Sequence, residues 1–250
     1  MASVSLTGVS VSFPIYDASN TSLKKRLLPT LTGGRIGAAD AHVPVVEALE
    51  DITLNMEHGD RVGLVGHNGA GKTTLLRVLA GIYEPASGQV QISGRAVPLF
   101  DIGLGMDAEA TGYENIYLRG LFLGISRKEI KKRIDDIASF TELGDFLHLP
   151  IRTYSTGMRM RLAFAISTSV EPDILLLDEG IGAGDAAFVE KANQRIQSFA
   201  SRAGIIVLAS HSEDLIRRIC RTAILMERGR ILDVGEVEPI LERYRERLAQ

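Results

Sequence analysis

Several things are scarce in this sequence, and each scarcity excludes a class of protein. Cys220 is the only cysteine among 250 residues, which rules out a disulfide framework or a cysteine-based metal site within one chain. The formal net charge of −3 offers no basic excess for binding nucleic acid. No apolar run approaches the roughly 20 residues needed to cross a bilayer. The N-terminus lacks the basic and apolar regions of a secretory signal, so we expect a cytosolic protein that reaches a membrane only through a partner.

Apolar residues make up 45% of the chain and follow the patterns of strands and helices. Residues 4–13 alternate apolar and polar side chains, as a half-buried strand does. Residues 61–65, 174–177 and 205–209 are continuously apolar and are separated by helical segments. Such strands predict a parallel sheet covered on both faces, and therefore an α/β fold. Further strands are expected at residues 48–56, 89–92, 96–100, 222–226 and 230–234, and helices at 73–81, 187–201 and the end of the chain.

Two segments depart from this alternation. Residues 17–44 contain several Gly and Pro residues and a short basic run at residues 23–28, and we interpret them as an insertion that leaves the core. A contact or packing element is favoured over a membrane anchor, because six residues bury too little apolar surface. From residue 113 to residue 148 the pattern becomes helical, with two apolar stripes at helical spacing.

The strongest motif is a glycine-rich loop after the strand at residues 61–65. It reads G-H-N-G-A-G-K-T-T and fits G-x-x-x-x-G-K-[ST] between an apolar strand and a helix. The glycines let the backbone wrap around phosphate oxygens, and the helix N-terminus adds an anion site. Lys72 is expected to reach the β- and γ-phosphates and Thr73 to bind Mg²⁺, which predicts a nucleoside triphosphate but not its use. The predicted phosphate-binding residues are Gly66, His67, Asn68, Gly69, Ala70, Gly71, Lys72, Thr73 and Thr74.

Two other apolar strands end in polar side chains suited to the same chemistry. Asp178 ends one strand, where it is expected to support Mg²⁺ through bound water. Glu179 follows on the opposite side of the chain and is a candidate general base or water-positioning group. His211 follows the strand at residues 205–209 and can reach the γ-phosphate. Alone, the acids read as a solvated strand end and the histidine as structural, but beside a phosphate loop Lys72, Glu179 and His211 are the predicted catalytic residues.

The segment Tyr154-Ser-Thr-Gly-Met158 begins another helix, and alone it reads as a surface helix capped by Ser155. It follows the phosphate loop and precedes the Asp178–Glu179 pair, residues 183–185 and His211. With these motifs in this order, the chain resembles the ATP-binding-cassette ATPases over nearly its whole length. The resemblance implies one P-loop NTPase domain over residues 1–250, with a parallel-sheet core, an antiparallel β subdomain and an α-helical subdomain at about residues 101–165.

The resemblance also implies how ATP is held. Residues 154–158 stand in place of the signature L-S-G-G-Q, which binds the ATP of a second subunit in a head-to-tail dimer. His211 matches the switch histidine, and residues 183–185 match a loop that contacts the opposite subunit. An aromatic side chain stacks on adenine, with Phe13 as the first candidate and Tyr16 as the second. The ATP contacts implied beyond the phosphate loop are Phe13, Ser155, Thr156, Gly157, Met158 and Asp185.

Two features depart from the family pattern. The signature keeps its serine and glycine but carries Thr156 and Met158, and the following Arg159 and Arg161 either steer phosphate or face solvent. The loop that usually carries a Mg²⁺-binding glutamine has none. Asp101 is its nearest polar residue and becomes the candidate metal ligand there.

Four longer stretches narrow the resemblance to the ATPase subunits that export bacterial cell-surface polysaccharides. They are G-R-A-V-P-L-F-D-I-G-L-G, T-G-Y-E-N-I-Y-L-R-G-L-F-L-G, Y-S-T-G-M-R-M-R-L-A-F-A and L-L-L-D-E-G-I-G-A-G-D-A-A-F. The chain stops at Gln250, so we expect the short form without a C-terminal glycan-binding domain. We expect an ATPase that uses ATP and Mg²⁺, forms a homodimer and binds integral membrane permease subunits at the cytoplasmic face of the bacterial inner membrane.

Other functions compete with polysaccharide export. Another exported cargo is the main rival. A cassette ATPase of DNA repair or translation usually carries a coiled-coil insertion or two tandem cassettes, and the sequence has neither. A plain nucleotide switch or kinase has no use for both a signature and a switch histidine.

Overall fold

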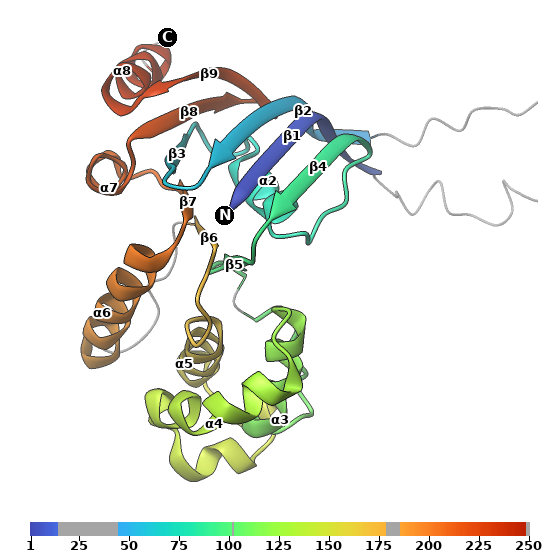
Figure 1. The fold of residues 1–250 in the computed structure, drawn as a ribbon, viewed down its shortest axis with the longest axis vertical. Coiled ribbons are helices and arrows are strands. Elements are labelled where there is room, and N and C mark those ends of the chain that lie inside the picture. Colours follow the sequence, from blue (N-terminus) through green and yellow to red (C-terminus); the bar gives the residue numbers. More distant parts are fainter. Residues whose placement is uncertain (15–44, 102, 179–185, 249–250) are drawn as a thin grey trace, which may run out of the picture.

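The computed structural model describes residues 1–14, 45–101, 103–178 and 186–248, and it consists of two β-sheets and a group of helices beside them (Figure 1). The sheets lie at one end of the molecule and a group of helices lies at the other. The predictions for residues 17–44 and 183–185 fall outside the described residues. In the described ranges no helix is long and apolar enough to cross a membrane.

A six-stranded sheet forms the centre of the molecule, in the order β5-β6-β7-β3-β8-β9. Its first five strands are parallel, as predicted, and β9 runs antiparallel to β8. The last pair is antiparallel because a two-residue turn joins it, in which Arg228 and Gly229 have φ of 47° and 79°. The strands are β3 (Arg61–Val65), β5 (Ala96–Pro98), β6 (Ile174–Asp178), β7 (Ile205–Ala209), β8 (Thr222–Glu227) and β9 (Arg230–Glu236).

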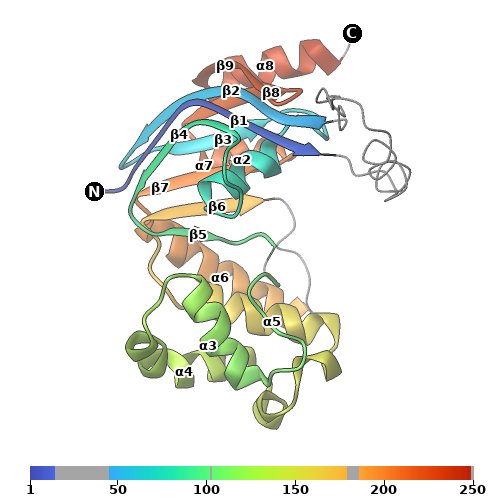
Figure 2. The same ribbon diagram turned by 90° about the vertical axis from the view of Figure 1, so that its right-hand side faces the viewer.

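A smaller antiparallel sheet covers one face of the central sheet. It contains β1 (Ser3–Pro14), β2 (Val45–Glu57) and β4 (Ser87–Ser93) in the order β2-β1-β4. Helix α2 (Lys72–Leu79) lies between the two sheets, and their apolar side chains form one buried core (Figure 2). Leu6 of β1, Leu76 of α2 and Leu64 of β3 are each fully buried in it.

The opposite face of the central sheet is covered by helices. These are α6 (Ala186–Arg202), α7 (Glu213–Ile219) and α8 (Val237–Leu248). Phe199, Ile216 and Leu241 pack there with side chains of β6, β7 and β8 in a second buried core. Both faces are therefore covered, which confirms the expectation from continuously apolar strands.

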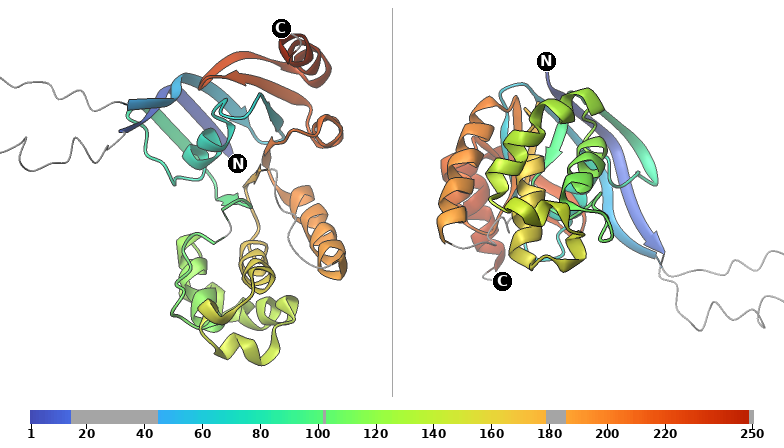
Figure 3. Two further views of the ribbon diagram at one scale, coloured as in Figure 1. Left: turned by 180° about the vertical axis from the view of Figure 1, so that it is seen from behind. Right: turned by 90° about the horizontal axis from the view of Figure 1, so that it is seen from below.

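The remaining helices form a group that we call the helical lobe. It contains α3 (Gly112–Phe122), α4 (Arg127–Thr141) and α5 (Thr156–Ser167), with the short 3₁₀ helices η2 (Gly144–His148) and η3 (Ile151–Thr153) (Figure 3). Thr111 and Ser126 begin α3 and α4 with capping boxes, in which side chain and backbone bond reciprocally. The lobe has its own apolar core, to which α6 contributes Phe188.

The carboxyl ends of three neighbouring strands meet at one edge of the central sheet. In the register of the sheet, Ala209 of β7 lies beside both Leu64 of β3 and Asp178 of β6. The glycine-rich loop, Asp178 and the residues after β7 consequently leave the sheet side by side. Ligands of open α/β sheets bind at this edge.

Candidate nucleotide-binding site

The glycine-rich loop takes a backbone path that its glycines make possible. A Cβ at Gly66 would lie 2.3 Å from the carbonyl oxygen of Met226, and Gly71 has φ of 102°. Neither position accepts a side chain without a backbone shift or strain. The loop is also held from outside, because the amide of Gly229 donates to the carbonyl of Ala70 at 3.0 Å.

Helix α2 presents an uncapped N-terminus to the loop. Gly71 occupies its N-cap position and offers no side-chain hydrogen bond to the first-turn amides. These amides and the positive end of the helix dipole favour an anion. Lys72 is 8% exposed, and its Nζ donates to the carbonyl of Gly66 and, at 3.0 Å, to that of His67. The predicted phosphate ligand is thus held inside the loop.

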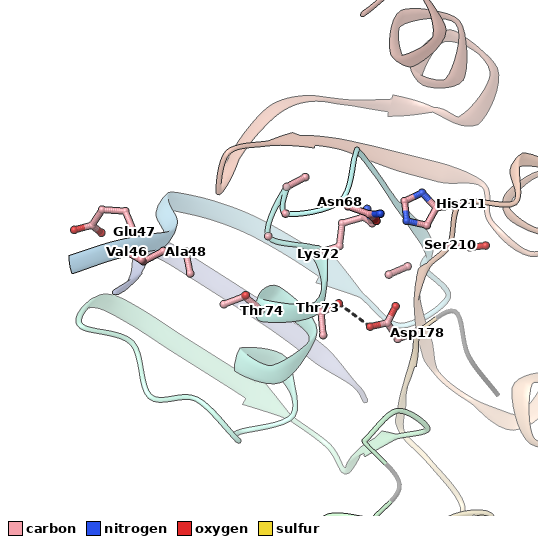
Figure 4. A pocket seen from close by; sticks show the side chains of 14 residues that line it. Val46, Glu47, Ala48, Asn68, Lys72, Thr73, Thr74, Asp178, Ser210 and His211 are labelled. Atoms are coloured by element: carbon pink, nitrogen blue, oxygen red, sulfur yellow. Dashed lines mark hydrogen bonds between the residues drawn. The ribbon is translucent and has the colours of Figure 1, made fainter. Parts of the chain in front are cut away.

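A hydroxyl and a carboxylate meet where α2 begins and β6 ends. Thr73 Oγ1 donates to Asp178 Oδ2 at 2.8 Å (Figure 4). Both residues were predicted to serve the same Mg²⁺ ion from positions far apart in the sequence. Oxygen atoms of this kind are the ligands that Mg²⁺ takes in nucleotide sites, so the pair fits the ion.

These groups line a cavity of about 530 Å³. Ser210 and His211 enter it from the end of β7, which places the predicted histidine beside the phosphate loop (Figure 4). Gly66 and His67 do not contribute to its lining, although they were predicted to contact phosphate. The ring Nδ1–H of His67 donates to the carbonyl of Asn68 at 2.6 Å. Among the described residues, the lining consists of Val46, Glu47, Ala48, Asn68, Gly69, Ala70, Gly71, Lys72, Thr73, Thr74, Asp178, Ala209, Ser210 and His211.

Three lining residues from β2 were not predicted. Val46, Glu47 and Ala48 form the wall of the cavity on the side opposite His211 (Figure 4). Their sequence, V-E-A, carries no motif. They belong to the site only because β2 lies beside the glycine-rich loop, where a Cβ on Gly71 would approach the carbonyl of Ala48 to 3.0 Å.

Phe13, the first candidate for stacking on adenine, has an aromatic partner within the chain. Its ring meets that of Tyr83 edge to face, with 5.1 Å between centroids. Phe13 is 38% exposed and pairs across the sheet with Val46, which does line the cavity. The ring of Phe13 itself is not part of the described lining, so its role stays a prediction. Tyr16, the second candidate, lies outside the described residues.

Asp101 is engaged away from the predicted metal site. Its Oδ2 lies 2.7 Å from Nε and 2.6 Å from Nη2 of Arg77, at the end of α2. It borders a different cavity and not the one at the phosphate loop. The described contacts of Asp101 therefore do not support its predicted role as a metal ligand. Glu179 and Asp185, two further predicted site residues, lie outside the described residues.

The signature segment lies on the helical lobe, away from the cavity. Ser155 Oγ accepts from the amide of Met158 at 3.2 Å and so caps α5. Ser155 and Thr156 are exposed, and Gly157 is half-buried. None of the residues of this segment lines the described part of the phosphate-loop cavity, so one subunit does not bring its two predicted ATP-binding parts together.

Tyr154 does not share the accessibility of its neighbours. Its side chain is 4% exposed, and its hydroxyl donates to the carbonyl of Phe146 at 2.6 Å. Burial raises the pKa of this phenol. The predicted ATP contacts of this segment are Ser155, Thr156, Gly157 and Met158, and the side chain of Tyr154 packs inside the lobe instead.

The two arginines after the signature have different environments. The guanidinium of Arg161 lies over the ring of Phe188, 4.9 Å from its centroid, and 3.9 Å from the carboxylate of Glu142. It ties α5 to α6 and to the end of α4. Arg159 is exposed. The sequence left two roles open for Arg161, steering phosphate or facing solvent. Neither describes it fully, because Phe188 and Glu142 of the same chain hold its guanidinium.

Curated proteins of one kind are similar to this chain. A sequence model described as ABC transporter matches residues 49–182. The O-antigen export system ATP-binding protein RfbE of Yersinia enterocolitica is 48% identical over 93% of this chain and 98% of its own length. An O-antigen export system ATP-binding protein RfbB of Klebsiella pneumoniae is 36% identical over 98% of both. The teichoic acids export ATP-binding protein TagH of Listeria innocua is 40% identical over 80% of this chain and 59% of its own length.

Solved structures share the fold. The ATP-binding cassette MJ0796, a dimer in a post-hydrolysis state bound to ADP and Pi, matches with a TM-score of 0.64 and 20% identity over 94% of this chain and 99% of its own. A structure described as the ATP binding subunit of an ABC transporter matches with a TM-score of 0.68 and 21% identity over 99% of both chains. At such identities the likeness concerns the fold, and it confirms the expected arrangement of two sheets and a helical lobe.

Proposed function

Because the chain belongs to the ABC transporter family of ATP-binding proteins, we propose that it is the ATP-hydrolysing subunit of an exporter of a lipid-linked cell-surface polysaccharide. The observation that carries the cargo class is the 48% identity to the Yersinia O-antigen export protein over 98% of that protein's length. The observation that carries the chemistry is the convergence of Lys72, Thr73, Asp178 and His211 on one cavity. We place the subunit at the cytoplasmic face of the bacterial inner membrane, bound to a permease.

The phosphate end of ATP fits the donors of the loop. The first-turn amides of α2 and the ammonium of Lys72 belong to one cavity, and Lys72 donates there to the carbonyl oxygens of Gly66 and His67. Phosphate oxygens are stronger acceptors than carbonyls, so the β- and γ-phosphates compete well for this ammonium. Thr73 and Asp178 would hold Mg²⁺, which neutralises phosphate charge when bound.

Hydrolysis needs a water in line with the γ-phosphate. We assign its orientation to Glu179, the residue after Asp178, as a general base or positioning group worth about 10²- to 10⁴-fold. His211 lines the cavity on the neighbouring strand end and is assigned to the γ-phosphate. The neighbouring Ser210 is buried, and its Oγ accepts from the amide of Ser212 at 2.9 Å, which stiffens the backbone beside the histidine.

The separation of the signature from the cavity supports a head-to-tail dimer. The amides of Thr156 and Gly157 form the first turn of α5, where Ser155 already satisfies the amide of Met158. This end of the helix is positive and suits a phosphate that a second copy brings. Each ATP is then held by the loop of one subunit and by Ser155 and Gly157 of the other. The dimeric cassette that shares this fold was solved with ADP and Pi.

A second cavity suits contact with a membrane subunit. It has about 440 Å³ and lies between the end of α2 and the loop that follows β5. The Arg77–Asp101 ion pair borders it, beside the ring of Tyr83 and the 38% exposed Leu104. We assign the permease contact to this cavity, because it lies between the phosphate-loop helix and the loop that leads into the helical lobe.

A strain deleted for the gene tests the proposal. It is expected to lose its surface polysaccharide and to accumulate the lipid-linked glycan inside the inner membrane. The wild-type gene should restore export, and Glu179→Gln should not. In solution, Glu179→Gln should still bind ATP and elute as a dimer on size-exclusion chromatography with ATP. Unchanged surface glycan in the deletion strain would reject the cargo, and a monomer at saturating ATP would reject the shared site.

A further inference from the structure

Helix α3 carries two polar side chains that are fully buried. Asn115 is 0% and Arg119 is 1% exposed. They lie one helical turn apart and therefore on the same face of α3, toward the interior of the helical lobe. Buried arginine and asparagine are rare unless they have partners, so their contacts indicate what they hold.

Asn115 binds the loop at residues 107–111. Its Oδ1 accepts from the amide of Asp107 at 2.7 Å. Its Nδ2 donates to the carbonyls of Asp107, Ala110 and Thr111 at 2.9, 3.0 and 2.9 Å. The oxygen and the nitrogen of the Asn115 amide group are both hydrogen-bonded. The side chain thus supplies the loop with hydrogen bonds that a helix or strand would otherwise provide.

The loop held by Asn115 in turn holds the segment that leads into the signature. The amide of Ile151 donates to the carbonyl of Ala110 at 3.0 Å, and that of Arg152 donates to the carbonyl of Ala108 at 2.9 Å. Thr111 forms an isolated antiparallel bridge with Pro150. Residues 150–152 end only a few positions before Ser155, so the loop fixes the path by which the chain enters α5.

Arg119 holds the other end of α5. Its Nε and Nη2 donate to Oγ of Ser167, the last residue of α5, at 3.2 and 2.8 Å. Its Nη1 donates to the carbonyl of Leu104. In the described ranges no carboxylate pairs with it, and burial lowers its pKa to about 10, so it stays charged at neutral pH. The negative end of the α5 dipole and the carbonyl of Leu104 compensate that charge.

Leu104 belongs to the loop that leaves the central sheet beside the nucleotide site. Pro98 of β5 pairs with Leu176 of β6, and the amide of Leu99 donates to the carbonyl of Leu176 at 2.9 Å. Leu176 lies two residues before Asp178. Arg119 thus connects a loop that starts near the cavity of this subunit to the helix whose first turn carries the signature.

We propose that Asn115 and Arg119 are positioning residues that join the β5 loop and α5 into one body and set where Ser155 and Gly157 meet the partner's ATP. This rests on the proposed function, in which the signature binds the nucleotide of a second copy. Three separate nitrogens of the Arg119 guanidinium bond Leu104 and Ser167, whereas lysine carries all of its donors on a single nitrogen and does not reproduce this fork. Neither residue is among the described residues that line the phosphate-loop cavity, so we expect them to act through the placement of α5.

Variants separate positioning from stability. Arg119→Lys and Ser167→Ala remove the bridge, and Arg119→Met keeps the volume without a buried charge and is expected to fold at least as stably. Asn115→Ala releases the loop. Arg127→Lys, an exposed arginine at the start of α4, is the matched control. Each variant is measured for affinity for a fluorescent ATP analogue, kcat and KM for ATP, Tm, and ATP-dependent dimerisation in the Glu179→Gln background.

We expect the bridge variants to keep nucleotide affinity and KM within about twofold while kcat falls about 10- to 100-fold, as for a misplacement of about 1 Å. Dimerisation with ATP should weaken in parallel, and Arg127→Lys should match the wild type. Ser167→Thr should restore kcat relative to Ser167→Ala. Wild-type kcat in Arg119→Met and Ser167→Ala overturns the inference, as does a joint fall of affinity, kcat and Tm. If the parent Glu179→Gln protein itself fails to dimerise with ATP, the proposed function fails instead.

Discussion

The hydroxyl of Tyr154 provides a quantitative test of which signature side chains face the nucleotide. In Tyr154→Phe the bond to the carbonyl of Phe146 is lost, but that carbonyl still accepts from the amide of Leu149 at 2.9 Å. No acceptor is left unsatisfied, so the cost is that of one ordinary hydrogen bond, about 0.5–1.5 kcal/mol. For a chain of this size the Tm should fall by about 2–4 °C per kcal/mol. Nucleotide affinity and kcat should not change, because the ring stays buried.

Thermal unfolding and steady-state ATP hydrolysis, measured on the same preparations, decide the matter. Tyr117→Phe is the control, because the described residues give its hydroxyl no hydrogen bond. A Tm unchanged within error together with a kcat loss of tenfold or more would refute the reasoning, since it would mean that the hydroxyl acts on the nucleotide. A fall of Tm by about 10 °C would also refute it, because one replaceable hydrogen bond is too small a loss.

Three further results are expected. Lys72→Ala should lower kcat by at least about 10²-fold without lowering Tm, because it removes a phosphate donor and a buried charge together; radiolabelled ATP hydrolysis and calorimetry check this. Gly66→Ala should cost about 1–3 kcal/mol and weaken ATP binding, because its Cβ would meet Met226. Gly69→Ala meets no atom and carries only the strain of its φ of 81°, so it should cost less in a denaturant titration. Cys220 should react with a thiol reagent only on unfolding, because burial raises its pKa from 9.0 to about 12; the same shift adds stability below pH 9 that is lost as pH rises toward 12.

Most of the fold was predictable because the local pattern of apolar residues indicates which type of strand a segment forms. Continuous apolar runs at β6 and β7 indicated buried parallel strands, and the alternating run at β1 indicated a half-buried one. The core of the candidate site was predictable for a related reason. Its phosphate loop and Asp178 each follow such a strand, and parallel strands bring their carboxyl ends to one edge.

What sequence reasoning could not supply were the partners of individual side chains. Asp101 was considered for Mg²⁺, but Arg77, 24 residues earlier, holds its carboxylate. Phe13 was considered for adenine, and its ring meets Tyr83. Asn115 and Arg119 look like ordinary polar positions in the helix T-G-Y-E-N-I-Y-L-R-G. Each of these contacts depends on how separate elements pack, and no short-range pattern reports it.

The sequence by itself therefore determined which chemistry this protein carries. The order of a glycine-rich loop, a serine-glycine signature, an acidic strand end and a histidine is a local property, since each motif needs only its neighbouring strand or helix. The tertiary structure decided how these motifs are distributed in space. It brought Thr73 to within 2.8 Å of Asp178 across more than a hundred residues and kept Ser155 on a separate lobe. The physical reason is that packing of elements distant in the chain sets these positions, and no local pattern of residues reports that packing.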